Sequence, residues 1–232
     1  MSHVPTYSPL PRAYFDRPTL DVARDLVGRW LVHERNGTVL AGRIVETEAY
    51  TQDDPAFHGW GLVDLQTGLV RMEGRAYDLF GVPGTAYVYL IYGAYWLLNV
   101  VTEREGVGGA VLIRALEPVR GIEGMFARRP NARSLRDLCS GPGKLTLALG
   151  VTNAQHGQDL TRPPLYFADP EPEHHPEIAT SSRIGITRGT ELPWRFFVPD
   201  SPFVSPGVPS DLTAARRRAT KNPVGQVVRR GL

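Results

Sequence analysis

The stretch AYVYLIYGAYWLLNV, residues 86–100, decides the fold because two strand-forming runs flank one turn signal. Tyr, Val, Ile and Trp favour the pleated sheet, and Tyr92-Gly93 between the runs is typical of a tight hairpin turn. A turn of this kind would push the large Tyr92 ring outward. The segment therefore predicts a β-hairpin, whose tyrosines either pack in a core, as composition alone favours, or lie exposed at the tip.

The two runs of this hairpin cover residues 86–91 and 96–102. Further strand-like runs on both sides extend it into a sheet; they cover residues 30–33, 39–50, 110–115, 183–186 and 194–198. Helical signals are fewer. Pro18 begins a short amphipathic helix that ends at Gly28, Pro118 is expected to open a second helix, and Ser140 is expected to cap a third that Gly150 ends. Strands outnumber helices and no regular crossover helices separate them. The sequence thus predicts an α+β fold, a single domain with a mainly antiparallel mixed β-sheet, flanking helices and a protruding β-hairpin.

The composition is that of an ordinary globular protein, with 232 residues, 42% hydrophobic and 22% charged, and a mean hydropathy of -0.21. No apolar run approaches the roughly 20 residues that a membrane span needs, and the Pro-rich start lacks the apolar core of a signal peptide. We therefore expect a cytoplasmic protein with no membrane partner. The single cysteine, Cys139, excludes a disulfide framework and a cysteine zinc site within one chain.

Charge and proline patterns divide the chain into a flexible N-terminal arm (1–17), a domain (18–210) and a basic C-terminal tail (211–232). The tail is rich in basic groups and contains Asp211 as its single acid; the basic groups are Arg216, Arg217, Arg218, Lys221, Arg229 and Arg230. A second basic cluster runs from Arg114 to Lys144. Concentrated charge on a nearly neutral chain suits a polyanion partner, but charge alone favours a solvated face with a disordered tail.

Cofactor motifs are absent from the sequence. Gly141-Pro142-Gly143-Lys144 resembles a phosphate loop, but Leu145 stands where a hydroxyl should hold Mg²⁺. No Gly-rich dinucleotide fingerprint and no nucleophile elbow occurs. We therefore predict no cofactor and no bound metal.

The segment GRIVETEAYTQDDPAFH, residues 42–58, is the densest in chemistry-bearing side chains. A strand period of two places Glu46, Glu48 and Tyr50 on one face. Three interpretations compete: a solvated strand face, a divalent-metal site completed by Asp53, Asp54 and His58, or a general base beside an aromatic stacking platform.

Several blocks in one order identify a resemblance that covers roughly residues 20–195. They are ETEAY at 46–50, DPAFH at 54–58, PG at 83–84, YVYLIYG at 87–93, NV at 99–100, RALEP at 114–118, SGPGKL at 140–145, RIGI at 183–186 and WRF at 194–196. Together they resemble the alkyladenine (3-methyladenine) DNA glycosylase family.

The resemblance implies an enzyme that binds double-stranded DNA, turns a damaged purine out of the helix and hydrolyses its N-glycosidic bond. By resemblance, Glu48 activates the water and Arg114 holds that water and Glu48. The implied base pocket has Tyr50 and His58 on one face of the base and Tyr89 on the other. The remaining implied roles are a wedge in the duplex for Tyr92, a gate against the guanine amino group for Asn99, and a phosphate or structural contact for Lys144.

Two features of the sequence agree with this picture. Alkylated purines are cationic, so aromatic walls attract them by about 0.5–2 kcal/mol more than neutral bases. Lys144 and Lys221 are the chain's lysines, and neither is expected in the pocket, so we predict a monofunctional enzyme without a Schiff-base step. We expect a monomer and assign the tail arginines Arg216, Arg217 and Arg218 to phosphate contacts. The alternatives are a non-catalytic damage-binding protein on the same scaffold and a Mg²⁺-dependent nuclease.

Overall fold

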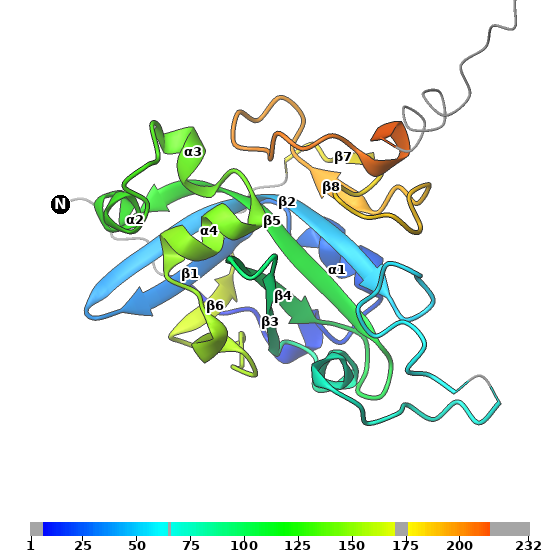
Figure 1. Cartoon of the computed structure of the whole chain (residues 1–232). Helices are drawn as coiled ribbons and strands as arrows, with labels where there is room; N and C mark the ends of the chain where they lie inside the picture. The colour runs from blue at the N-terminus through cyan, green and yellow to red at the C-terminus, as the bar shows by residue number, and fades with distance from the viewer. Residues whose placement is uncertain (1–6, 65, 170–175, 214–232) are drawn as a thin grey trace, which may run out of the picture.

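The computed structural model describes residues 7–64, 66–169 and 176–213 (Figure 1). The strands are β1 Trp30–Arg35, β2 Thr38–Thr51, β3 Ala86–Ile91, β4 Tyr95–Val101, β5 Gly109–Arg120, β6 Leu165–Ala168, β7 Ala179–Ser181 and β8 Arg195–Phe197. The α-helices are α1 Thr19–Asp25, α2 Ile122–Arg128, α3 Leu135–Cys139 and α4 Pro142–Leu149, and the 3₁₀ helices are η1 Arg12–Tyr14, η2 Arg75–Phe80 and η3 Asn153–Gln155.

The strands form one curled sheet in the order β3-β4-β5-β2-β1-β6, and β8 joins β2 and β7. The strand pairs in this sheet are antiparallel. Strand β2 is its longest member and contacts β5 along most of its length, β1 with its first half and β8 with its second half. The predicted α+β fold with a mainly antiparallel sheet is confirmed.

The helices cover this sheet where its apolar side chains need partners. Helix α1 lies behind β2 and β5, and α2, α3 and α4 gather at one end of the sheet (Figure 1). The main core joins α1, α4 and the sheet through buried side chains such as Leu26, Ile44 and Leu145. The hydroxyl of Thr47 on β2 donates to the carbonyl of Ala23 on α1 at 2.7 Å. This face of β2 is therefore structural, which leaves the opposite face for chemistry.

Strands β3 and β4 form the predicted hairpin, paired from Ala86↔Val100 to Ile91↔Tyr95. At its tip Tyr92 and Gly93 both have positive φ, 53° and 65°, and the N–H of Ala94 donates to the carbonyl of Ile91 at 3.1 Å. Positive φ at both central residues is typical of a type I′ turn, whose twist matches that of a hairpin. The turn leaves Tyr92 86% exposed.

Helix boundaries differ from the expectations at two places. Pro118 lies inside β5, next to an irregularity in its pairing with β2, where a missing N–H is tolerated. Helix α2 begins only after Gly121, which is left-handed with φ of 72°. Helix α4 follows Gly141 rather than Ser140 and ends before Gly150 as expected.

The described part of the N-terminal arm is packed, in contrast to the loose attachment that we expected. Leu10 and Phe15 are buried in the main core. The N–H of Leu10 donates to the carbonyl of Phe167 at 2.8 Å, which ties the arm to β6. Within the described ranges, no helix is long and apolar enough to cross a membrane.

Candidate active site

Three side chains of β2 converge on the face of the sheet opposite α1, as the period of two predicts. Glu46 and Glu48 both contact Arg114 of β5, and Tyr50 contacts Glu48. The neighbouring Thr47 points the other way, towards α1. Two carboxylates, one guanidinium and one phenol therefore form a single cluster.

The carboxylate of Glu48 is 0% exposed and receives hydrogen bonds from three separate segments. Its Oε2 accepts from the Tyr50 hydroxyl at 2.8 Å and from Arg114 Nη1 at 3.1 Å. Its Oε1 accepts from the backbone N–H of Ile184 at 2.7 Å. An ionised carboxylate has about four lone-pair sites. These bonds use two sites on Oε2 and one on Oε1, so Oε1 has capacity for one further donor.

Glu46 anchors the guanidinium that faces Glu48. Its Oε1 accepts from Arg114 Nε at 2.9 Å, from Arg195 Nε at 2.6 Å and from the Ser205 hydroxyl at 2.8 Å. Its Oε2 accepts from the backbone N–H of Ser205 at 2.7 Å. Both carboxylate oxygens of Glu46 therefore accept from protein donors, and one of these donors is Arg114.

The ionisation states follow from burial and from these neighbours. Burial disfavours the charged form of Arg114, but the adjacent Glu48 and Glu46 outweigh it and raise the pKa of Arg114. Burial and the charge of Glu48 raise the pKa of Tyr50 well above its ordinary value, and they raise the pKa of Tyr89 to about 12. Arg114 is therefore a fixed cation, and both tyrosines are neutral phenols.

A small cavity of about 100 Å³ opens beside this cluster and is bordered by aromatic rings. Its walls include Tyr50 of β2, Tyr89 of β3, Asn99 of β4 and His58; they are completed by Ala56, Phe57, Leu79, Tyr87, Ala110 and Ile186. The Nδ2 of Asn99 donates to the carbonyl of Tyr87 at 3.2 Å, which fixes its amide at the wall. The cavity thus brings together the four predicted pocket residues.

The His58 ring packs against two tyrosines. Its centroid lies 5.8 Å from that of Tyr87 and 5.3 Å from that of Tyr89, and its Nδ1 is 2.6 Å from the Tyr87 hydroxyl. Rings at such separations are in direct contact, so a base can lie between His58 and Tyr89 only after one ring moves. Burial, followed by the charge of Arg75, lowers the pKa of His58 and favours the neutral imidazole.

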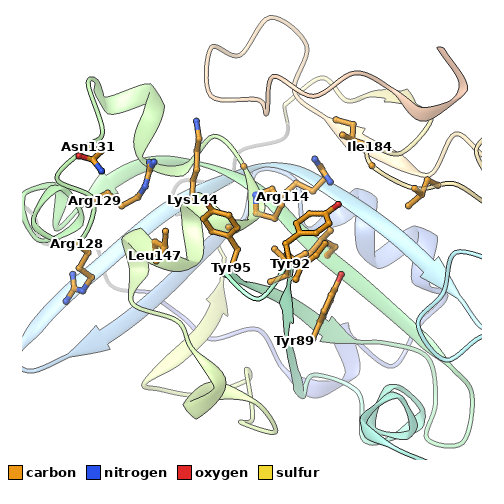
Figure 2. A pocket seen from close by; sticks show the side chains of 18 of the residues that line it. Tyr89, Tyr92, Tyr95, Arg114, Arg128, Arg129, Asn131, Lys144, Leu147 and Ile184 are labelled. Atoms are coloured by element: carbon orange, nitrogen blue, oxygen red, sulfur yellow. The ribbon is translucent and has the colours of Figure 1, made fainter. Parts of the chain in front are cut away.

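A larger groove of about 720 Å³ adjoins the small cavity and runs between the hairpin, α4 and residues 184–186. Figure 2 shows Tyr89, Tyr92 and Tyr95 of the hairpin on this groove, together with Arg114 and Lys144. Lys144 contacts Asp137 and the hydroxyl of Ser140, away from Glu48. The structure therefore places Lys144 outside the carboxylate cluster, whereas Arg216, Arg217 and Arg218 lie outside the described residues.

The acidic side chains that a metal site would require are separated or already paired. Asp53 is exposed, whereas Asp54 is buried and forms an ion pair with Arg183. Glu46 and Glu48 face arginines. Among the described residues, no group of three or more His, Cys, Asp or Glu side chains could hold a metal ion. Nothing in this geometry favours the nuclease alternative.

Several residues that complete the cluster have no role predicted from the sequence. Ile184 and Arg195 lie in blocks that carry the family resemblance, so the sequence marked both residues, but it did not indicate what either one contacts. Ser205 contacts Glu46 across 159 positions of the chain, and no local pattern marks it. Arg183 and Asp54 form the fully buried ion pair behind Tyr50.

Comparisons with known proteins agree with the resemblance. Residues 13–202 match the family described as Methylpurine-DNA glycosylase (MPG). A relative from Salinibacter ruber is 55% identical over 204 residues, covering 87% of this chain and 98% of its own. A relative from Chlorobium luteolum is 46% identical over 203 residues, which cover 87% of this chain and 98% of the relative. A relative from Methanoculleus marisnigri is 47% identical over 199 residues, which cover 84% of this chain and 98% of the relative. All three are named "Putative 3-methyladenine DNA glycosylase". The chain belongs to the methylpurine-DNA glycosylase family, whose members are DNA repair enzymes that hydrolyse N-glycosyl bonds.

Proposed function

We propose that this enzyme, acting as a monomer, turns a damaged purine out of duplex DNA and hydrolyses its N-glycosidic bond with a water activated by Glu48. The observation that carries the proposal is the Glu48 carboxylate, which is held by three donors and keeps one accepting position on Oε1. A water bound there would give its proton to Glu48 as it attacks the sugar C1′. Arg114 and Glu46 then fix the carboxylate without taking part in the proton transfer.

The aromatic cavity suits the flipped base. Tyr50 and Tyr89 border both the small cavity and the groove, so a base entering from the groove passes between residues that can stack on it. A neutral His58 does not repel a cationic alkylated purine. Since His58 and Tyr89 now touch, we expect base entry to separate these two rings.

Base release from defined duplexes is the direct test of this function. Duplexes that each carry one 3-methyladenine, 7-methylguanine, hypoxanthine or ethenoadenine are incubated with the enzyme and excess EDTA. We expect free base and an intact strand with an abasic site. Binding without base release would favour the damage-binding alternative. Loss of activity in EDTA would favour the nuclease alternative. A covalent adduct trapped by borohydride would contradict a monofunctional enzyme.

Replacing Asn99 with serine is expected to widen the substrate range. Asn99 is held at the cavity wall by the carbonyl of Tyr87, and the shorter side chain leaves room for a purine amino group. The measurement is release of unmodified guanine and of 7-methylguanine, with Asn153→Ser as an exposed control. An unchanged substrate profile would remove Asn99 from the gating role.

Replacing Tyr92 with alanine is expected to weaken binding to damaged DNA with little effect on folding. The ring is 86% exposed at the hairpin tip, so its removal should change the free energy of unfolding by no more than about 0.5 kcal/mol. Affinity for a hypoxanthine duplex is compared with that of Tyr92→Leu, which keeps an apolar wedge. A large fall in melting temperature would show that Tyr92 supports the fold instead.

A further inference from the structure

Arg183 and Asp54 form a buried ion pair next to Tyr50, whose hydroxyl donates to Glu48. Both side chains are 0% exposed, and the two Nη atoms of Arg183 contact the two carboxylate oxygens of Asp54, with Nη2 2.9 Å from Oδ1. The guanidinium also donates to the carbonyls of Ala49 at 2.9 Å and Gly189 at 3.2 Å. Buried ion pairs add little net stability compared with apolar side chains of similar volume. Stability alone is therefore a weak explanation for this pair.

The pair contacts two of the segments that hold Glu48. The Arg183 guanidinium carbon lies 4.5 Å from the centroid of the Tyr50 ring, whose hydroxyl donates to Glu48 Oε2. The residue after Arg183 is Ile184, whose N–H donates to Glu48 Oε1. Arg183 is thus linked to two of the three donors on the carboxylate, to Tyr50 through its guanidinium and to Ile184 through the peptide bond.

We infer that the Arg183–Asp54 pair is a positioning device for the hydrolysis, which aims the Glu48 carboxylate by fixing Tyr50 and the Ile184 N–H. This inference rests on the proposed role of Glu48. The Arg183 guanidinium is fully buried and is occupied by Asp54, by the carbonyls of Ala49 and Gly189 and by the Tyr50 ring, so it acts through its neighbours and not on the substrate. A misplacement of about 1 Å at a reacting group can reduce a rate by roughly 100-fold.

Gly189 provides a way to disturb the pair without removing a charge. Its φ is +57°, and a Cβ at this position would lie 2.8 Å from Asp54 Oδ1 and 3.0 Å from Arg183 Nη2. An alanine would therefore push directly on the ion pair. It would alter no group that contacts Glu48.

The test compares rate with affinity in Arg183→Lys, which keeps the charge but loses the planar fork. We expect the single-turnover rate of hypoxanthine release to fall by roughly 10-fold to 100-fold, while the dissociation constant for the same duplex stays within about threefold. Gly189→Ala should shift the two quantities in the same way. Arg29→Lys is the matched control, because Arg29 also contacts an aspartate, Asp169, and lies 5.9 Å from a tyrosine ring.

A purely structural pair would give a different result. Arg183→Lys would then lower the melting temperature while the folded protein released base at the wild-type rate, and this outcome would overturn the inference. If Arg183→Lys does not fold, Gly189→Ala decides on the same two measurements. A wild-type chain that binds the duplex but releases no base would refute the proposed function itself, so the two failures are distinguishable.

Discussion

Glu48→Gln is expected to slow base release by roughly 100-fold to 10,000-fold and to leave the affinity for damaged DNA within a few fold. Glutamine has nearly the same shape, so the cavity walls remain in place, but its amide cannot accept the proton of the attacking water. The measurement pairs single-turnover release from a hypoxanthine duplex with a binding isotherm on the same duplex.

In Glu48→Gln, the side-chain amide of the glutamine also meets hydrogen-bond donors at both former oxygen positions of Glu48. Arg114 and Tyr50 approach one oxygen of Glu48 and the Ile184 N–H approaches the other, so Glu48→Gln leaves one buried donor without an acceptor. We expect a stability loss of about 1–3 kcal/mol, and activity is therefore compared at a temperature where the variant is folded. Glu34→Gln is the control, because Glu34 on β1 also accepts a tyrosine hydroxyl, at 2.8 Å. Base release at the wild-type rate by Glu48→Gln would exclude Glu48 as the base.

Arg114→Met is expected to destabilise the protein by about 3–5 kcal/mol and to reduce base release in the protein that still folds. Arg114 is the cation between Glu46 and Glu48, both of which are fully buried. Methionine keeps much of the stem volume but leaves two buried carboxylates facing each other. Chemical denaturation measures the first effect and single-turnover release the second.

Arg43→Met provides the comparison for this substitution. Arg43 also lies on the sheet, with its guanidinium 5.4 Å from the Trp30 ring, and it borders neither the groove nor the small cavity. Its loss should cost about 0.5–1 kcal/mol and leave base release unchanged. Equal losses of stability in the two variants would contradict the bridging role of Arg114.

The features that could be predicted from the sequence are those that depend on residues close together in the chain. The alternation of β2 placed Glu46, Glu48 and Tyr50 on one face, and the Tyr92-Gly93 pair marked the hairpin tip. The family resemblance extended this to Arg114, which the structure brings to both glutamates. The catalytic and binding roles of these residues stay predictions.

The features that could not be predicted depend on contacts between distant segments. Proline often stands in the first turn of a helix, so Pro118 was expected to open one. Its place in a strand is explained only by the irregular pairing of β5 with β2. The N-terminal arm looked loose because the partner of Leu10 is Phe167, far along the chain. The backbone N–H of Ser205 leaves no trace in a sequence, since nearly any residue offers one, and that of Ile184 was marked only by the block RIGI that carries the family resemblance.

The distance along the chain between Glu48 and Ile184 has a consequence for biosynthesis. The ribosome makes Glu48 136 positions before Ile184, whose backbone N–H donates to it, and Ser205 follows later still. A nascent or truncated polypeptide ending before Ile184 would carry the chemical group without its alignment. Under the proposed mechanism, base release would therefore begin only after most of the chain has been translated.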